Sequence, residues 1–285
     1  MTEQTTAVPD AAVPLEAAAT PDTGAAGPAA PAPRDRRALR AVLRWTAAVL
    51  VFGAAGAGTA YGIARAERTD LPGLSTKGDG RWAYPALVRP TPPPGAPLPF
   101  AADNPDGIHY AGLTQLLLPA PRGSAPDAGL KLEKDSAVTV DTFLEEYEPS
   151  ARDKLRAQFD LNGLRQIAGR GWTTPDGTRT RVYLLRYHAS GFADTFKGCG
   201  ADMELNGVKQ VVTDEVWNKA KVEQVSPAVE GLKALEEAVP FGDEQTRVGC
   251  VESGDIRAVI LQSRKGGAAA VPLHQAVILQ NQLLQ

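Results

Sequence analysis

An uncharged stretch of twenty residues covers residues 45–64, where apolar and small residues fill every position except a few hydroxyl side chains. As a helix, with a rise of about 1.5 Å per residue, this stretch is about 30 Å long, which matches the hydrocarbon core of a bilayer. Lipid cannot hydrogen-bond to exposed backbone, so a lone apolar segment of this length is expected to be helical. The pattern predicts one transmembrane helix at 45–64.

Basic residues crowd the N-terminal side of this segment and predict its direction. Only Asp35 offsets them, and an excess of arginine marks the cytoplasmic side of a membrane. The chain is therefore expected to be a single-pass protein of the plasma membrane with a cytoplasmic N-terminus and an extracytoplasmic C-terminal domain. The residues expected to orient the segment are Arg34, Arg36, Arg37, Arg40 and Arg44.

A cleaved export signal is the alternative to an uncleaved signal-anchor. Arg36-Arg37 resembles part of a twin-arginine signal, and Ala64-Arg65-Ala66 has the small-x-small form of a cleavage site. The long stretch before the apolar run and the length of the run favour the anchor. Both interpretations export the greater part of the chain, and the sequence leaves open whether cleavage occurs.

The segments around the apolar run have the composition of disordered chain and spacer. Residues 1–44 are rich in Ala, Pro and Thr and end in the basic cluster, which predicts a disordered cytoplasmic tail. Residues 65–106 are rich in proline and predict a stiff polyproline stalk. Trp82, Tyr84 and Leu87 are expected either to pack on the domain that follows or to lie at the lipid interface.

Residues 107–285 have the composition of one globular domain, and hairpin patterns dominate their local structure. Turn residues at Pro175-Asp176-Gly177 and at Ser253-Gly254-Asp255 separate runs of β-branched and aromatic residues, which predicts two β-hairpins. A further strand is expected at 208–213, and helices are expected at 228–238 and 272–284. The fold class predicted is α+β, with antiparallel hairpins packed by helices.

Two further helices are expected between the stalk and the first hairpin. Asp141 is expected to cap one of them, and Ser150 is expected to cap the other. The second helix is expected to present Leu155, Phe159, Leu164 and Ile167 on one apolar face, and Asn162-Gly163 is a possible interruption.

Cys199 and Cys250 are the two cysteines of the chain, and both belong to the part expected outside the membrane. In an oxidising compartment, two cysteines indicate one disulfide. A metal site is not expected, because the distant His109, His188 and His274 give no ligand spacing with these thiols.

No motif for catalysis or for a cofactor occurs in the chain, so we expect no catalytic residue, no cofactor and no metal. Several side chains are candidates for chemistry by residue type alone, and we interpret them as solvated, capping or core residues. The acids are Asp202, Glu204, Asp214 and Glu215; the possible bases are His188 and His274. A possible anion contact is Arg264-Lys265-Gly266-Gly267, and Trp172 and Trp217 are possible sugar platforms.

The net charge and the spacing of small residues limit which partners are expected. The net charge is −3 without a basic domain, so nucleic acid is not an expected partner, whereas membrane lipid is. Gly58 and Gly62 have the small-xxx-small spacing that lets two helices approach, which allows a homodimer.

Three stretches resemble actinobacterial single-pass membrane proteins of unknown function: LLLPAPRG at 116–123, RVYLLRY at 181–187 and VESGDIRAV at 251–259. The last is also similar to extracellular sensor-like domains of actinobacterial serine/threonine kinases and related lipoproteins. The chain has no kinase domain and no lipobox cysteine. The resemblance implies a cell-envelope location and an α+β domain, and it carries over no functional residues.

These observations favour a non-enzymatic protein that binds a ligand or a partner at the cell envelope. One alternative is a structural or assembly subunit of a membrane complex, and another is a cell-envelope hydrolase without a recognisable motif. The sequence leaves open the identity of the ligand or partner, any enzymatic activity and the oligomeric state.

Overall fold

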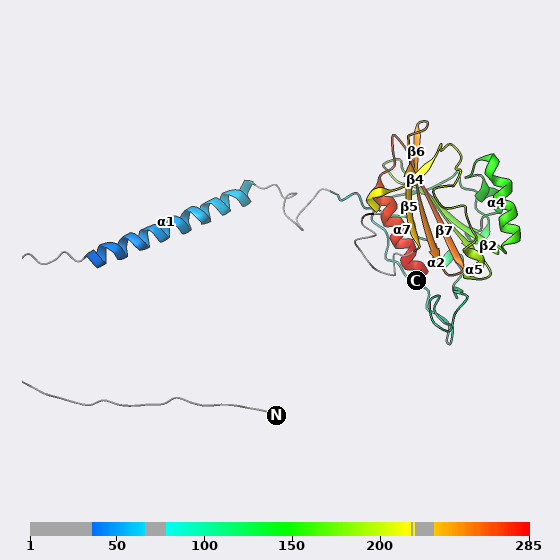
Figure 1. The fold of residues 1–285 in the computed structure, drawn as a ribbon, viewed down its shortest axis with the longest axis horizontal. Helices are drawn as coiled ribbons and strands as arrows, with labels where there is room; N and C mark the ends of the chain where they lie inside the picture. Colours follow the sequence, from blue (N-terminus) through cyan, green and yellow to red (C-terminus); the bar gives the residue numbers. More distant parts are fainter. Residues whose placement is uncertain (1–35, 66–77, 218, 220–230) are drawn as a thin grey trace, which may run out of the picture. The chain divides into compact units, whose positions relative to one another are not determined.

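The computed structural model describes residues 36–65, 78–217, 219 and 231–285, and the chain forms two units, Met1–Ser75 and Thr76–Gln285 (Figure 1). Most of the tail that is predicted to be disordered, including Arg34, lies outside the described residues. The first unit contains one long helix, and the second contains a mixed helix and sheet fold.

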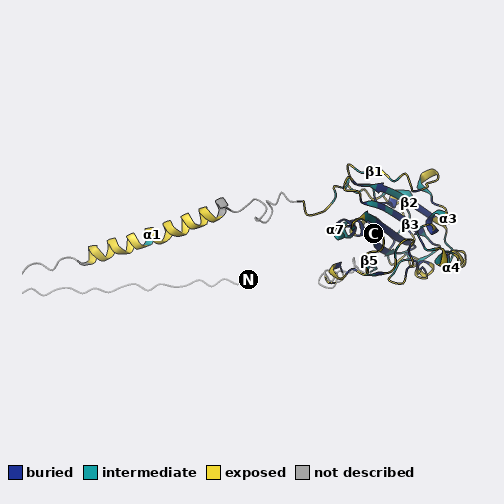
Figure 2. Ribbon diagram, turned by 90° about the horizontal axis from the view of Figure 1, so that it is seen from above, coloured by how far each residue is buried: buried dark blue, intermediate teal, exposed yellow. Residues whose placement is uncertain are grey.

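The first unit holds α1, a helix of 30 residues over Arg36–Arg65. Its segment Arg37–Gly62 is long and apolar enough to cross a membrane. Apolar side chains such as Phe52 are exposed along it, and Figure 2 shows exposed residues over most of its length. The hydroxyls of Thr46 and Thr59 donate to carbonyl oxygens four residues earlier, each at 2.8 Å, so these polar groups are satisfied within the helix. The expected apolar helix is confirmed, and it begins earlier than residue 45.

The second unit is built on one antiparallel sheet of seven strands in the order β1-β2-β3-β7-β6-β5-β4. Its strands are β1 (Ala125–Pro126), β2 (Gln166–Thr173), β3 (Arg179–Arg186), β4 (Val211–Thr213), β5 (Leu232–Glu237), β6 (Glu244–Ser253) and β7 (Ile256–Lys265). The two predicted hairpins are confirmed as β2–β3 and β6–β7. They meet at the centre of the sheet, where β3 pairs with β7.

Helices cover the two faces of this sheet. They are α2 (Leu113–Leu116), α3 (Val140–Leu144), α4 (Pro149–Leu161), α5 (Ser190–Ala193) and α7 (Ala270–Leu284), with a 3-10 turn at Lys134–Ser136. One apolar cluster joins α7 and α2 to the sheet, and another joins α3, α4 and α5 to it. Alternate residues of β3 divide between the clusters, as the pleat requires: Leu184 belongs to the first and Leu185 to the second. We call these sides the α7 face and the α4 face; Figure 1 shows the two helices on opposite sides of the sheet.

The helix predicted at 228–238 is wrong, because its described residues form the strand β5. Residues 228–230 lie outside the described part of the chain. The spacing of Leu232 and Leu235, together with lysine and glutamate between and after them, favours a helix locally. Pairing with β6 on one side and β4 on the other overrides this preference, so that Leu232 points to the α7 face and Leu235 to the α4 face.

The helix starts near residues 141 and 150 also differ from the prediction. Thr139, not Asp141, caps α3, because its Oγ1 accepts from Thr142 N at 3.1 Å. Ser150 lies inside α4, which begins at Pro149, a residue suited to the first helical position.

The same helix is also shorter than predicted. The helix α4 ends at Leu161, and Gly163 follows with a φ of 65°. Ile167 therefore belongs to β2 and not to the apolar face of the helix.

The proline-rich segment lies against the domain over much of its described length. Trp82 and Gln275 exchange two hydrogen bonds, of 2.8 and 2.9 Å, and the ring of Tyr84 meets Trp172 edge-on. Tyr110 donates to the carbonyl of Pro90 at 2.6 Å. Of the two expectations for Trp82 and Tyr84, the structure shows packing on the domain.

Cys199 and Cys250 form the predicted disulfide, with their Cα atoms 5.9 Å apart. Cys250 lies on β6 and is buried in the α4-face cluster, which Cys199 also contacts. The bond thus ties the segment after α5 to the centre of the sheet.

Candidate functional site

On the α4 face, Arg181 joins two partly buried carboxylates. Its Nε lies 2.6 Å from Asp127 Oδ2, and its Nη1 lies 2.7 Å from Glu146 Oε1. Tyr183 donates its hydroxyl to the same Glu146 oxygen. Burial and the negative charge of Glu146 raise the pKa of Tyr183, so this hydroxyl stays protonated. A cavity of about 70 Å³ adjoins the group, which we call the Arg181 cluster.

At the end of the sheet near α5, His109, Ser253 and Asp255 have the composition of a catalytic triad. His109 Nδ1 lies 2.6 Å from Asp255 Oδ1, and His109 Nε2 lies 3.5 Å from Ser253 Oγ. All three residues are buried. The carbonyl oxygen of Leu284, in the last turn of α7, lies 2.8 Å from His109 Nε2 and 2.9 Å from Ser253 Oγ.

These contacts connect the three residues to the end of α7. The carbonyl of Leu284 can only accept, so Ser253 Oγ donates to it and His109 Nε2 donates as well. The group therefore acts as a clasp that holds the end of α7 against the β6–β7 turn.

On the α7 face, Asp214 lies at the centre of a second charged network. Its Oδ2 accepts from His274 Nε2 at 2.8 Å and from Arg247 Nη1 at 2.9 Å, and its Oδ1 accepts from Trp217 N at 3.0 Å. Burial alone raises the pKa of Asp214, but the hydrogen bonds of Trp217 and His274 and the charges of His274 and Arg247 outweigh it. The net effect is a lowered pKa, so Asp214 is a carboxylate at neutral pH.

Arg247 links this network to a cavity at the end of the sheet. Its Nη2 lies 2.7 Å from Glu236 Oε2, and its Nε donates to the carbonyl of Ala268 at 2.8 Å. The cavity, of about 210 Å³, lies between the β5–β6 loop and the loop that leads into α7, and Arg247 and Glu236 line it. Arg247 thus contacts Asp214 in the interior of the α7 face and also lines the open cavity.

Polar residues continue inward from Arg247 in one row across the sheet. Arg247 is the Cα partner of Gln262 on β7, Gln262 is the partner of Thr180 on β3, and Thr180 is the partner of Trp172 on β2. Direct partners point to the same face with Cβ atoms about 4.5–5.5 Å apart. We call Gln262, Thr180 and Trp172 the polar row; all three are 0% exposed.

The polar row has buried hydrogen-bonding atoms without partners in the described part of the chain. They are Gln262 Nε2 and Oε1, Thr180 Oγ1 and Trp172 Nε1. A buried polar group that lacks a hydrogen bond costs about 1–3 kcal/mol, and such groups are uncommon in native proteins. An apolar side chain at position 262 would avoid this cost.

The candidate acids Asp202, Glu204, Asp214 and Glu215 do not lie together in one site. Asp202 and Glu204 are exposed, and Glu204 accepts from Ser150 Oγ on the α4 face at 3.1 Å. Asp214, by contrast, is buried against α7 on the other face, and its neighbour Glu215 is exposed. No pair of carboxylates with a shared site results.

The candidate bases also have separate places. His274 contacts Asp214, a partner that local sequence spacing could not reveal. His188 packs edge-on against Phe192. Within the described residues, no group of three or more His, Cys, Asp or Glu side chains could hold a metal ion.

The remaining candidates are structural or belong to the cavity. Arg264 and Lys265 pair with Asp176 and Asp243, at 3.8 and 3.4 Å, so neither is an isolated anion contact. Gly267 lines the cavity beside Arg247. Both tryptophans are buried: Trp172 is in the polar row, and Trp217 packs on the His274 ring.

Comparison of the chain with protein-family models, with curated proteins and with solved structures finds no match. The interpretation of the site therefore depends on the geometry above.

Proposed function

We propose that this chain is a single-pass protein of the plasma membrane whose C-terminal domain lies outside the cell and binds a ligand or partner without catalysis. The observation that carries the proposal is α1: an apolar helix of sufficient length for a bilayer, with exposed apolar side chains and with arginines at its N-terminal end. In water such a surface is unfavourable, whereas in lipid it is the solvated state.

The arginines support an inside N-terminus. Arg36, Arg37, Arg40 and Arg44 lie in the first turns of α1, and the next 20 positions hold no charged residue. The translocation machinery retains such basic ends on the cytoplasmic side. The domain after the helix is then extracytoplasmic, which agrees with the Cys199–Cys250 disulfide, because such bonds persist in oxidising compartments.

The internal contacts of the acid–base groups support binding without catalysis. His109 uses both ring nitrogens within its clasp, and the carboxylates of the Arg181 cluster are held by Arg181 and Tyr183. A catalytic base needs a free lone pair within reach of a substrate proton. The polar row and the adjoining cavity instead offer hydrogen-bonding groups, which is the chemistry of recognition.

Topology and capture in intact cells test the proposal together. A photo-crosslinking residue is placed at Val239, which is exposed, in the full-length protein. An impermeant protease added to wall-stripped cells is expected to digest the C-terminal domain, and crosslinking is expected to capture a ligand or partner. Protection of the domain, while a known surface marker is digested, contradicts the proposed location. A stable equimolar protein partner would instead support the assembly-subunit alternative.

Self-association through α1 is tested in the same membranes. Gly58 and Gly62 have open space where a side chain would begin. Replacing both with isoleucine is expected to abolish any homodimer seen by crosslinking, because bulky side chains keep two helices apart. A dimer that persists in this variant would place the contact elsewhere.

A further inference from the structure

We infer that residues 78–90 form a releasable strap, which detaches from the α7 face as one unit while the sheet stays folded. In chain order the strap lies between α1 and the folded domain, so its release adds free chain to the tether that joins them. At 3.3–3.6 Å per extended residue, the released strap adds up to about 45 Å of chain. That α1 holds one end of this tether in a membrane rests on the proposed function, whereas the detachment itself does not.

The strap is tied to the domain at separate points. Trp82 N donates to Gln275 Oε1 at 2.8 Å, and Gln275 Nε2 donates to Trp82 O at 2.9 Å. Next to this pair, Arg122 N donates to Ala83 O at 2.7 Å. Residues 78–90 contain no helix or strand, so no ladder of hydrogen bonds joins them to the sheet. Loss of these few ties frees the strap without breaking any strand pairing.

The domain covers only one side of the strap. Tyr84 and Leu87 are partly buried against the apolar cluster of the α7 face, whereas Arg81 is exposed and Val88 is 78% exposed. At the centre of the sheet, by contrast, β3 and β7 pair along the whole of β3, and most of the paired side chains are buried. Local opening occurs where buried apolar contacts are few and backbone hydrogen bonds lie near solvent. The strap should therefore open before the sheet does.

Docking of the strap also buries a polar group of its own. The ring of Tyr84 meets Trp172 edge-on, with the ring centroids 6.5 Å apart. The Tyr84 hydroxyl is buried and has no hydrogen-bond partner among the described residues. Detachment brings this hydroxyl into water, which offsets part of the apolar contact that is lost. The docked and detached states therefore differ less in free energy than their contact surface alone suggests.

Prolines favour the return of the strap to its docked position. Pro85 lies inside the strap and Pro90 ends it, where the Tyr110 hydroxyl donates to the Pro90 carbonyl at 2.6 Å. Proline restricts φ, so a detached strap samples fewer conformations than an ordinary chain and loses less entropy when it docks again. This composition suits reversible detachment.

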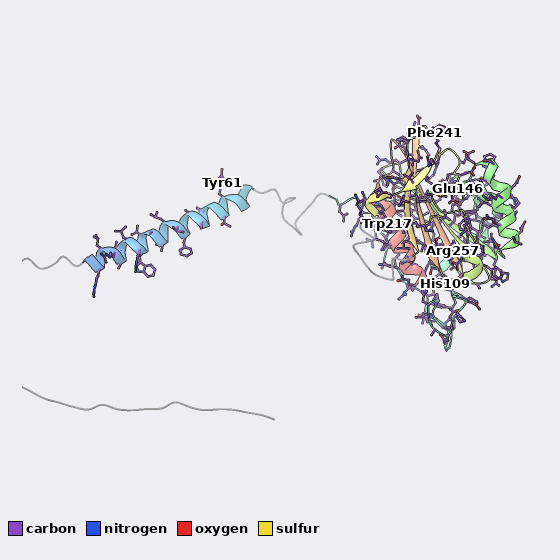
Figure 3. The ribbon with its side chains drawn as sticks, viewed as in Figure 1. Tyr61, His109, Glu146, Trp217, Phe241 and Arg257 are labelled. Atoms are coloured by element: carbon purple, nitrogen blue, oxygen red, sulfur yellow. A yellow bond between two sulfur atoms is a disulfide. The ribbon has the colours of Figure 1, made fainter. Side chains whose placement is uncertain are left out.

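The helix α7, which receives the strap, has its own attachments to the domain. Near its start, His274 Nε2 donates to Asp214 at 2.8 Å, and the Trp217 ring packs on His274. At its end, the Leu284 carbonyl lies 2.8 Å from His109 Nε2. Figure 3 labels Trp217 and His109 near the opposite ends of α7. The helix therefore keeps its place when the strap leaves.

Amide hydrogen exchange of the full-length protein in lipid nanodiscs, read at residue resolution by mass spectrometry, tests the strap. The reporters are the N–H groups of Trp82, on the strap, and of Arg122, on the domain. Arg122 belongs to an exposed loop, and its N–H is bonded to the strap carbonyl of Ala83. The amides of β3 are the reference, because their exchange follows the opening of the sheet.

The first variant weakens the ties of the strap. Gln275→Ala removes both bonds to Trp82 and introduces a good helix former into α7. The matched control is Gln282→Ala, the same substitution at an exposed glutamine of the same helix.

The second variant locks the strap with a disulfide between Gly80→Cys and Val271→Cys. A Cβ atom at Gly80 would lie 3.5 Å from Val271 Cβ, a separation that a disulfide spans. Because Gly80 has a φ of 83°, any side chain there is strained. The double variant Gly80→Ser with Val271→Ser is therefore the control, since it has the same strain without the bond.

In the wild type both reporters are expected to share one protection factor, at least about tenfold lower than that of the β3 amides. Gln275→Ala is expected to lower the protection of both on the order of tenfold, as the loss of two hydrogen bonds predicts, without changing the β3 amides. Gln282→Ala should behave as the wild type does, and the disulfide should raise the protection of both reporters above that of its serine control.

Arg122 is the decisive reporter, because Gln275→Ala removes the acceptor of Trp82 N directly but leaves the bond of Arg122 intact. The inference is overturned if Gln275→Ala leaves Arg122 unchanged, or if the wild-type reporters are as protected as the β3 amides. Either result would leave the proposed location untouched. Protection of the domain from external protease would instead contradict the location while detachment of the strap stands.

Discussion

The Arg181 cluster and the polar row lie on opposite faces of the sheet and differ in how their polar groups are paired. On the α4 face, Arg181 lies between Asp127 and Glu146, Tyr183 completes the group, and the charges have partners at 2.6 and 2.7 Å. On the α7 face, Gln262 is as deeply buried as Tyr183, but its amide has no partner among the described residues. The same sheet thus has one polar group whose members satisfy each other and another whose amide has no partner among the described residues.

This difference separates two roles that burial alone cannot distinguish. Removing one member of a satisfied cluster leaves its partners without hydrogen bonds and destabilises the protein. Removing a group that has no partner leaves nothing unsatisfied, so the fold should lose little or gain. Stability measurements on variants of the two groups should therefore diverge.

The largest effect is expected at the disulfide of the α4 face. Replacing Cys199 by alanine frees a loop of 51 residues in the unfolded chain, and the chain-entropy model gives a loss of about 4 kcal/mol. Denaturant unfolding of the full-length protein, followed by tryptophan fluorescence, measures it. Reductant added to the wild type should reproduce the loss, and a wild type insensitive to reductant would contradict the prediction.

Arg181→Met should have the next largest effect. It leaves the carboxylates of Asp127 and Glu146 buried without their cation, and the expected loss is about 3 kcal/mol. Adding Glu146→Gln to this variant should restore part of the stability, because one of the two uncompensated charges is removed. A single variant as stable as the wild type would mean that the cluster does not stabilise the α4 face.

Asp214→Asn should cost about 2 kcal/mol at neutral pH, because the charged hydrogen bonds from His274 and Arg247 are weakened. The pKa of Asp214 is lowered in the folded state, so its contribution is fully present above the unfolded value of 3.8. It disappears as the pH falls through the lower folded-state pKa. The stability difference between wild type and variant should therefore be constant near neutral pH and shrink below 3.8; a difference that grows on acidification would refute this sign.

Gln262→Met should have the smallest effect on stability, between no change and a gain of about 1 kcal/mol, because an apolar side chain of similar length replaces an unpartnered amide. Thermal unfolding of the two proteins measures it. A loss comparable to that of Arg181→Met would show that the amide has a structural partner, and the contrast between the two faces would fail.

The sequence predicted those features that depend on local residues. The turns at Asp176 and Gly254 identified both hairpins, and the two cysteines identified the disulfide. The strand β5 was missed because the spacing of Leu232 and Leu235 also fits a helix, and only its pairing with β4 and β6 decides between the two.

The candidate site depends on long-range register, which the sequence does not show. Gln262 and Arg247 are brought together by the β6–β7 hairpin, but Thr180 reaches Gln262 only through the β3–β7 pairing between two separate hairpins. Asp214 and His274 are 60 residues apart and meet only when α7 packs on the sheet. For this reason His274 had no visible partner in the sequence.

The difference in stability between Gln262→Met and Arg181→Met, measured by denaturant unfolding of the full-length protein under the same conditions, tests the contrast between the polar row and the Arg181 cluster most directly. Gln262→Met should be as stable as the wild type or slightly more stable, whereas Arg181→Met should lose about 3 kcal/mol. Equal losses of stability in the two variants would contradict the account.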